Sequence, residues 1–421
     1  MKEFTAPTTA HKDDRVTKNS KAFNKIARGM FLAGLSCFMQ LYLFQPILPA
    51  IGKEFSINPA ESSLTVSFST IGIAAGLFAG ALLADRISRK SLIGLALISS
   101  SVLTVMSSFV TFFPLLITIN MLKGFFLSGS ASVAMTYIAE EIHPSALGKA
   151  TGLYITGNAI GGMSGRIAAT LITGWLSWHW ATGIVGTICF IFGLLFVIEA
   201  PSSKHFKPYR TDALKGLKTM SIHLKNPLLL SMYILAGLYL GSFVSIYNYL
   251  AFRMQDSPFF LPHEVLASIY LMYIVGSAGS MTAGVLSDKF TSQKTLPAIV
   301  SFLFIGLLLM LTPSLMLVIL GLGVFTYSFF GAHTIASKIV AQHSPVGKPV
   351  SISLFLLFYY AGSSLLGTGS GVIMHNYGWA AFIFTLCAVS LVCLFISVYF
   401  RRWVEKPLPK VLVKESVQQE A

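Results

Sequence analysis

The chain has 421 residues, of which 54% are hydrophobic and 11% are charged, and its mean hydropathy is +0.72. Soluble domains carry about 25% charged residues, so this composition excludes an ordinary soluble protein and indicates a membrane protein. The formal net charge of +14 would suit a nucleic-acid-binding protein, but the positions of the basic residues, given below, exclude that class.

The apolar segments predict an all-α membrane protein with twelve transmembrane helices of about 20 residues each. The first 28 residues are polar and basic and a full-length apolar stretch follows, so we expect an uncleaved first helix rather than a signal peptide. Prolines at 46 and 49 should bend the outer end of that helix. The expected spans lie near residues 29–50, 63–84, 91–111, 114–137, 149–172, 179–199, 227–250, 265–286, 295–312, 314–337, 350–373 and 379–400.

The only long polar stretch between spans, residues 200–226, divides the twelve helices six and six. We therefore expect five parts. They are a cytoplasmic basic N-terminal tail (1–28), a six-helix bundle (29–199), a cytoplasmic linker (200–226), a second six-helix bundle (227–400) and a cytoplasmic C-terminal tail (401–421).

Basic residues are concentrated on one side of the predicted membrane. Of the 30 Lys and Arg residues, 26 lie in the tails, the linker and the loops of that side, and only Lys53 and Arg253 lie on the other. This asymmetry follows the positive-inside rule and predicts that both termini are cytoplasmic. The partners expected are membrane lipids rather than nucleic acid, and the location expected is the bacterial cytoplasmic (inner) membrane, with multiple passes.

The two halves of the chain share an ordered series of short matches, offset by 199–203 residues. The matched pairs are Asp85-Arg86 with Asp288-Lys289, Gly148-Lys149 with Gly347-Lys348, Gly161-Gly162 with Gly362-Ser363, and Trp180-Ala181 with Trp379-Ala380. Such a duplication predicts two bundles related by a pseudo-twofold axis, with the solute site at the repeat interface.

Two motifs carry a family resemblance. Residues 81–90 (ALLADRISRK) resemble the loop signature G-x-L-x-D-R-x-G-R-K of the major facilitator superfamily, with Ala81 and Ser88 in place of its glycines. Residues 157–166 (GNAIGGMSGR) are similar to the signature of the drug/proton antiporter branch, with Gly162 where a proline is expected.

Two further stretches, SGSASVAMTYIAEEIHPS at 128–145 and HNYGW at 375–379, are similar to one sub-branch of bacterial inner-membrane transport proteins. The resemblance covers residues 25–400. It implies two six-helix bundles that export a small solute in exchange for protons.

Charged residues at the end of the second span are candidates for a cytoplasmic gate. They lie at the negative end of the helix dipole, beside the cytoplasmic leaflet, and a carboxylate among three cations can exchange partners as the bundles rock. These residues are Asp85, Arg86, Arg89 and Lys90, with Asp288 and Lys289 in the corresponding loop of the second half.

Lys123 lies inside a span, whereas no Asp or Glu lies midway through one. A cation at a helix centre costs roughly 2.5–3.5 kcal/mol on insertion scales, so such residues typically face a water-filled cavity. Lys123 lies nine residues into its span, about 13 Å deep, and shares a helix face with Asn120. The family places an Arg where Asn120 stands, so we infer that the cation has moved about one turn and still serves the cavity.

Arg166 is the second cation inside a span, in an i, i+4, i+8 row with Asn158 and Gly162. We expect Arg166 and Asn158 to face the cavity, and snorkelling of Arg166 to the outer interface is the alternative. Small residues on the neighbouring face should allow close approach of another helix. The packing glycines expected on this helix are Gly157, Gly161, Gly162 and Gly165.

Two fixed cations without a membrane carboxylate would repel cationic drugs and favour anionic, zwitterionic or neutral amphipathic solutes. Lys123, a buried amine, and His333 are candidates for carrying a coupling proton, the latter because the unperturbed pKa of a histidine is about 6.5. Six more residues are expected to line the cavity. They are Tyr42 and Gln45 in the first helix, their repeat partners Tyr247 and Asn248 in the seventh, Tyr327 in the tenth and Tyr360 in the eleventh.

We therefore predict a monomeric secondary active transporter that works by alternating access, with proton-coupled efflux of a small solute as its activity. An uptake permease for a small metabolite, a channel and a membrane-embedded enzyme stay open as alternatives. The sequence has no G-x-S-x-G, H-E-x-x-H, Walker A or G-x-G-x-x-G motif for an enzyme. Its four cysteines lie in apolar segments without a C-x-x-C motif, so we expect no disulfide framework, no metal site and no cofactor.

The gate is testable with Asp85→Asn, which removes the charge and keeps the shape of the side chain. We expect transport into membrane vesicles to fall while the amount of protein in the membrane fraction, measured by immunoblot, stays normal. Transport at the wild-type rate would remove the gate role.

Overall fold

The computed structural model describes residues 15–18, 20–83, 87–206, 213–344 and 347–400. Its first half contains α1 (Lys21–Leu41), the 3-10 turn η1 (Gln45–Ile47), α2 (Leu48–Phe55), α3 (Pro59–Leu83), α4 (Arg89–Ser107), α5 (Phe113–Glu141), α6 (Pro144–Trp175) and α7 (Trp178–Glu199). After α8 (Ala213–Lys225) come α9 (Pro227–Gln255), α10 (His263–Ile269), α11 (Met272–Phe290), α12 (Ser292–Leu309), α13 (Leu315–His343) and α14 (Lys348–Tyr399).

Ten stretches of the described chain are long and apolar enough to cross a membrane. One of them, Val350–Tyr399, holds two helices that meet at Gly378, whose φ of 79° only glycine adopts without strain. α6, with 32 residues, is also long enough to cross a membrane but is not among the ten. Dividing α14 at Gly378 and adding α6 brings the number to the twelve that the sequence predicts, and the all-α fold class is confirmed.

The first helix begins earlier than predicted, and its far end is interrupted at the predicted prolines. It begins at Lys21 rather than near residue 29, because the Ser20 hydroxyl accepts a hydrogen bond from the Phe23 N–H at 3.1 Å and so caps the helix. Its C-terminal end breaks, as the prolines predict, since Pro46 and Pro49 offer no N–H to the preceding turn. The linker region at 200–226 also contains a helix, α8, that the sequence pattern did not predict.

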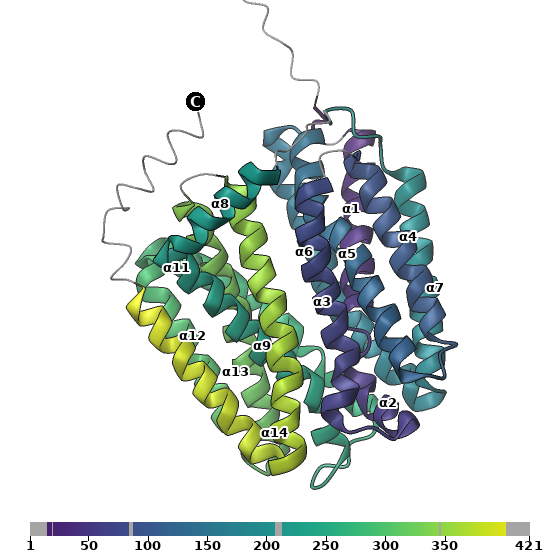
Figure 1. Cartoon of the computed structure of the whole chain (residues 1–421), viewed down its shortest axis with the longest axis vertical. Helices are drawn as coiled ribbons and strands as arrows, with labels where there is room; N and C mark the ends of the chain where they lie inside the picture. The colour runs from purple at the N-terminus through teal and green to yellow at the C-terminus, as the bar shows by residue number, and fades with distance from the viewer. Residues whose placement is uncertain (1–14, 19, 84–86, 207–212, 345–346, 401–421) are drawn as a thin grey trace, which may run out of the picture.

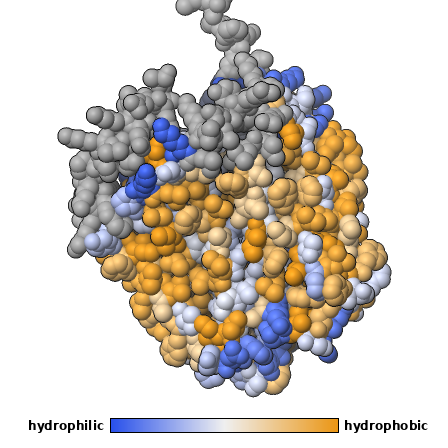
Figure 2. Space-filling view, viewed as in Figure 1, coloured by the Kyte–Doolittle hydropathy of each residue, from blue (hydrophilic) through white to orange (hydrophobic). Residues whose placement is uncertain are grey.

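The helices form two bundles that stand side by side, α1–α7 and α9–α14 (Figure 1). We call the end that holds α8 the α8 end and the opposite end the α2 end. Figure 2 shows apolar residues over most of the middle of one face and hydrophilic residues towards its two ends, as a membrane-crossing surface requires.

A row of glycines brings α1 and α6 into backbone contact. A Cβ added at any of the three would meet a backbone oxygen of α1 at 2.2–2.6 Å; the pairs are Gly157 with Phe31, Gly161 with Leu35 and Gly165 with Met39. The second half repeats this contact, because Gly362 of α14 lies against Gly237 of α9 in the same way. The internal repeat is therefore present in the packing as well as in the sequence.

The substitution Gly161→Ala should destabilise the protein by about 1–3 kcal/mol, because its Cβ would lie 2.2 Å from the Leu35 carbonyl oxygen. Gly152→Ala, on the same helix but with no atom within 4 Å of the new Cβ, is the matched control. The measurement is the thermal midpoint in detergent, and equal midpoints for the two variants would contradict the close packing.

Candidate functional site

Side-chain hydrogen bonds between the two bundles lie from the middle of the molecule towards the α2 end. They join Thr70 to Ser364 (2.7 Å), Ser67 to Thr368 (2.7 Å), Ser63 to Thr368 (3.3 Å), Gln45 to Asn248 (2.9 Å) and Trp175 to Glu264 (3.0 Å). Nearer the α8 end, no hydrogen bond between two described residues joins α1–α7 to α9–α14. The bundles are thus held together at the α2 end.

Arg166 of α6 lies fully buried between the bundles. Its Nε donates to the Gln45 Oε1 at 2.8 Å and its Nη2 donates to the same oxygen, while Nη1 donates to the Gly162 carbonyl. Gln45 in turn donates from Nε2 to the Asn248 Oδ1 at 2.9 Å. A single chain of hydrogen bonds therefore runs from Arg166 in one bundle to α9 in the other.

Three tyrosine rings enclose the guanidinium. Its carbon lies 4.5 Å from the ring centre of Tyr42, 4.6 Å from that of Tyr273 and 5.5 Å from that of Tyr247. Each ring face contributes about 0.5–2 kcal/mol of cation–π attraction, with the larger value in a dry site. None of the described carboxylates forms an ion pair with Arg166. Its charge is therefore stabilised by the dipoles of the amide and carbonyl groups and by the tyrosine rings.

The break in the first helix directs the side chain of Gln45 towards Arg166. Without the helical N–H groups of Pro46 and Pro49, α1 ends at Leu41, and the chain turns through Gln45, whose N–H donates to the Tyr42 carbonyl at 3.2 Å. The turn places Tyr42 and Gln45 together on the side of Arg166.

The ring of Tyr247 is held by an aromatic seam between α9 and α13. Rows spaced four residues apart, Tyr239, Phe243 and Tyr247 on α9 and Phe325, Phe329 and His333 on α13, interlock along it. Phe243 stacks on Phe329 with 3.8 Å between ring centres, and the Tyr247 hydroxyl hydrogen-bonds the Thr326 hydroxyl at 3.0 Å. The seam thus restricts the rotamers of the tyrosine that faces the cation.

Lys123 lies apart from Arg166, fully buried inside the first bundle. Its Nζ donates to the Asn120 Oδ1 and, at 3.2 Å, to the backbone oxygen of Gln40, and it lies 4.5 Å from the ring centre of Phe44. Because α1 ends at Leu41, the Gln40 carbonyl is among those left without a helical partner. The ammonium group therefore caps the negative end of α1.

The other cavity candidates do not meet at Arg166. The Nδ1 of His333 shares a hydrogen bond with the Tyr239 hydroxyl at 3.1 Å, and the hydroxyl of Tyr327 bonds Thr282 within the second bundle. Tyr360 is buried beside Tyr359, with 5.3 Å between ring centres. Asn158 lies against α1, where a Cβ on Gly34 would reach its Oδ1 at 2.4 Å.

Among the gate candidates, Asp85 and Arg86 lie outside the described residues. Arg89 pairs with Glu140 at 3.3 Å and lies 4.9 Å from the ring centre of Phe206, and the backbone N–H of Lys90 donates to the Ser203 hydroxyl at 3.0 Å. In the second half, Asp288 pairs with Lys338 of α13, and Lys289 lies 5.2 Å from the ring centre of Phe290.

Sequence reasoning missed Tyr270 and Tyr273, which join the Arg166 cluster from the second bundle. Tyr270 follows the end of α10 and Tyr273 lies in the first turn of α11, and the sequence does not show that this part of the chain meets Arg166. Sequence reasoning also missed Gln40, which accepts from Thr104 at 2.9 Å and donates to Ser101 at 3.3 Å beside Lys123.

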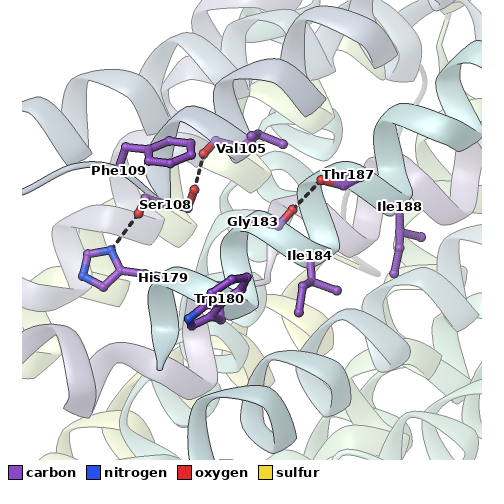
Figure 3. A pocket seen from close by; sticks show the side chains of 9 residues that line it. All are labelled: Val105, Ser108, Phe109, His179, Trp180, Gly183, Ile184, Thr187 and Ile188. Carbon is purple, nitrogen blue, oxygen red and sulfur yellow. Dashed lines mark hydrogen bonds between the residues drawn. The ribbon is translucent and has the colours of Figure 1, made fainter. Parts of the chain in front are cut away.

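A pocket of about 570 Å³ lies on the outside of the first bundle, between the end of α4 and the start of α7 (Figure 3). Phe109 and Trp180 line it and are largely exposed, while His179 at one side bonds the Ser108 carbonyl at 2.9 Å. It contains none of the residues between the bundles, so we do not place the solute there.

The closed α2 end is testable with the double variant Ser67→Cys/Thr368→Cys. The two hydroxyl oxygens are 2.7 Å apart, so the introduced thiols should form a disulfide on mild oxidation, which would stop transport until a reductant is added. The four native cysteines are buried and leave little background. Absence of the cross-link, seen by mass spectrometry of peptides, would show that these helices are not in contact.

Residues 30–346 match the family model described as Major Facilitator Superfamily. An uncharacterized transporter of Buchnera aphidicola subsp. Schizaphis graminum is 37% identical over 91% of this chain and 93% of its own length. The inner membrane transport protein YnfM of Escherichia coli K12 is 35% identical over 89% of this chain and 91% of its own length.

Among solved structures, the chain resembles a bacterial homologue of the human lysosomal transporter Spinster, in an inward-facing and unoccupied conformation. The TM-score is 0.70, with 15% identity over 91% of this chain and 96% of the other. At this identity the likeness establishes the fold alone.

Proposed function

This chain belongs to the major facilitator superfamily and is a membrane transporter rather than an enzyme, and we propose that it exports an anionic, zwitterionic or neutral amphipathic solute in exchange for protons. The expected resemblance to a sub-branch of bacterial inner-membrane transport proteins is confirmed by the 35% identity to YnfM. The substrate charge, the direction of transport, the coupling ion and a monomeric state are our proposal.

The buried, unpaired charge of Arg166 is the observation that carries the proposal. A charged group taken out of water costs several kcal/mol unless an opposite charge compensates it, and no described carboxylate does so here. A cationic drug would add to that cost, whereas an anionic solute would lower it. The site lies between the bundles, where alternating access exposes it to each side in turn.

The arrangement of the bundles supports rocking about this site. Hydrogen bonds join them at the α2 end, and the side with 26 of the 30 basic residues includes α8. If that side is cytoplasmic, as the positive-inside rule indicates, the protein is closed to the outside and accepts solute from the cytoplasm. The residues 85–90 and 288–289 would then form the gate that closes during export.

Lys123 is our candidate for the coupling proton. Its ammonium group caps the end of α1, a few residues before the turn that holds Gln45 against Arg166. Loss of the proton would remove the positive charge of this cap and so weaken it and loosen the turn, which links protonation to the solute site. His333, bonded to Tyr239 in the other bundle, is the second candidate.

Uptake of a small metabolite through the same cavity is the alternative that the geometry leaves open, since a carrier works in either direction. A channel is less well supported, because a channel needs a continuous pore ringed by like groups and the bundles here are joined at one end.

The proposal is tested in proteoliposomes with an imposed pH gradient and a panel of acidic, zwitterionic, neutral and cationic solutes. We expect gradient-driven movement of acidic solutes but not of ethidium. Arg166→Gln should reduce this transport at least about tenfold, the equivalent of 1.4 kcal/mol, because the charge that attracts the solute is gone.

Arg28→Gln removes an exposed arginine at the surface, paired with Glu199, and is the matched control expected to transport normally. Robust transport of ethidium by the wild type, or normal transport of acids by Arg166→Gln, would contradict the proposal.

A further inference from the structure

The edge of Arg166 that suits a carboxylate is occupied by a neutral amide. Nε and Nη2 both donate to the one oxygen of Gln45. This edge of a guanidinium presents two parallel N–H groups, which match the two oxygens of a carboxylate. A single amide oxygen accepts both bonds but supplies no negative charge.

Other donors around the cluster lack acceptors. The Asn248 Nδ2 and the hydroxyls of Tyr270 and Tyr273 are buried and have no hydrogen-bond partner among the described residues. Tyr273 covers the guanidinium, and Tyr270 lies 6.1 Å from Tyr247 between ring centres. Buried polar groups rarely lack hydrogen-bond partners. This cluster has one cation and three polar groups without a partner, so it lacks a group that accepts hydrogen bonds.

Gln45 also connects the bundles, because its Nε2 donates to Asn248 at 2.9 Å. Its side chain therefore cannot leave Arg166 without moving away from Asn248. The turn on which it lies contains Pro46 and has only 3-10 hydrogen bonds, so a change in that turn disrupts no α-helical bond.

From these contacts we propose that Gln45 is an internal substitute for the carboxylate of the solute. A solute carboxylate displaces the Gln45 oxygen from the Nε and Nη2 of Arg166 and thereby breaks the Gln45–Asn248 bond between the bundles. Binding of the solute thus loosens the closed α2 end. The inference rests on the proposed function and narrows it: the transported group is a carboxylate, and Gln45 is the residue that couples its binding to opening.

The test measures binding to the purified full chain in detergent, with benzoate as probe and benzamide and benzylamine as its neutral and cationic analogues. We expect the wild type to bind benzoate at least about tenfold more tightly than either analogue. Gln45→Glu carries its own carboxylate to Arg166, so it should lose benzoate binding at least about tenfold and unfold at a higher temperature without ligand.

Gln45→Ala removes the group that competes with the solute, so it should bind benzoate several-fold more tightly than the wild type. When Gln45→Ala is combined with Ser67→Cys/Thr368→Cys, the disulfide should form more slowly, because one contact between the bundles is gone. Gln342→Glu, on the exposed face of α13, adds the same charge elsewhere and should behave as the wild type.

The outcomes separate this inference from the proposed function. Benzoate binding that is unchanged in Gln45→Glu but lost in Arg166→Gln would overturn the role of Gln45 and leave anion transport standing. Weaker benzoate binding by Gln45→Ala, at least about tenfold, would also overturn it, since it would make Gln45 a ligand for the solute. Preference of the wild type for benzylamine would overturn both.

Discussion

The rest of the site depends on the charge of Arg166, which is buried between two bundles without an opposite charge. Its N–H groups donate to one amide oxygen and one backbone carbonyl. The rings of Tyr42, Tyr247 and Tyr273 make up the rest of its surroundings. These groups belong to the turn after α1 and to α6, α9 and α11, so the cation draws elements of both bundles together. A charge held in this way is stabilised well enough for the protein to fold. An anion that enters the site would compensate it better.

The two buried cations act on opposite sides of one break in the first helix. Lys123 caps the carbonyl of Gln40 where α1 ends, and Arg166 holds the side chain of Gln45 where the turn begins. Around this point, close glycine contacts such as Gly161 against Leu35 keep α1 fixed on α6. The first helix is thus packed closely on α6 along its length and interrupted towards the α2 end, beside Arg166.

The number of helices and several residues of the Arg166 site could be predicted from the sequence, for physical reasons. Apolar length predicted the twelve helices, and the internal repeat selected Tyr42, Gln45, Tyr247 and Asn248, which do lie together with Arg166. The sequence could not show that Lys123 points into its own bundle, because helix spacing does not reveal which neighbour a face meets. The start of α1 and the presence of α8 depend on caps and on packing against other helices, and Tyr273 required knowing which helix crosses Arg166.

The most direct test of a carboxylate at Arg166 is a cryo-electron microscopy structure of the wild-type protein with a transported acidic solute. We predict density for the solute's carboxylate against the Nε and Nη2 of Arg166, with the side chain of Gln45 turned away and its bond to Asn248 broken. A solute bound elsewhere, with the hydrogen bonds between Arg166 and Gln45 intact, would contradict this account.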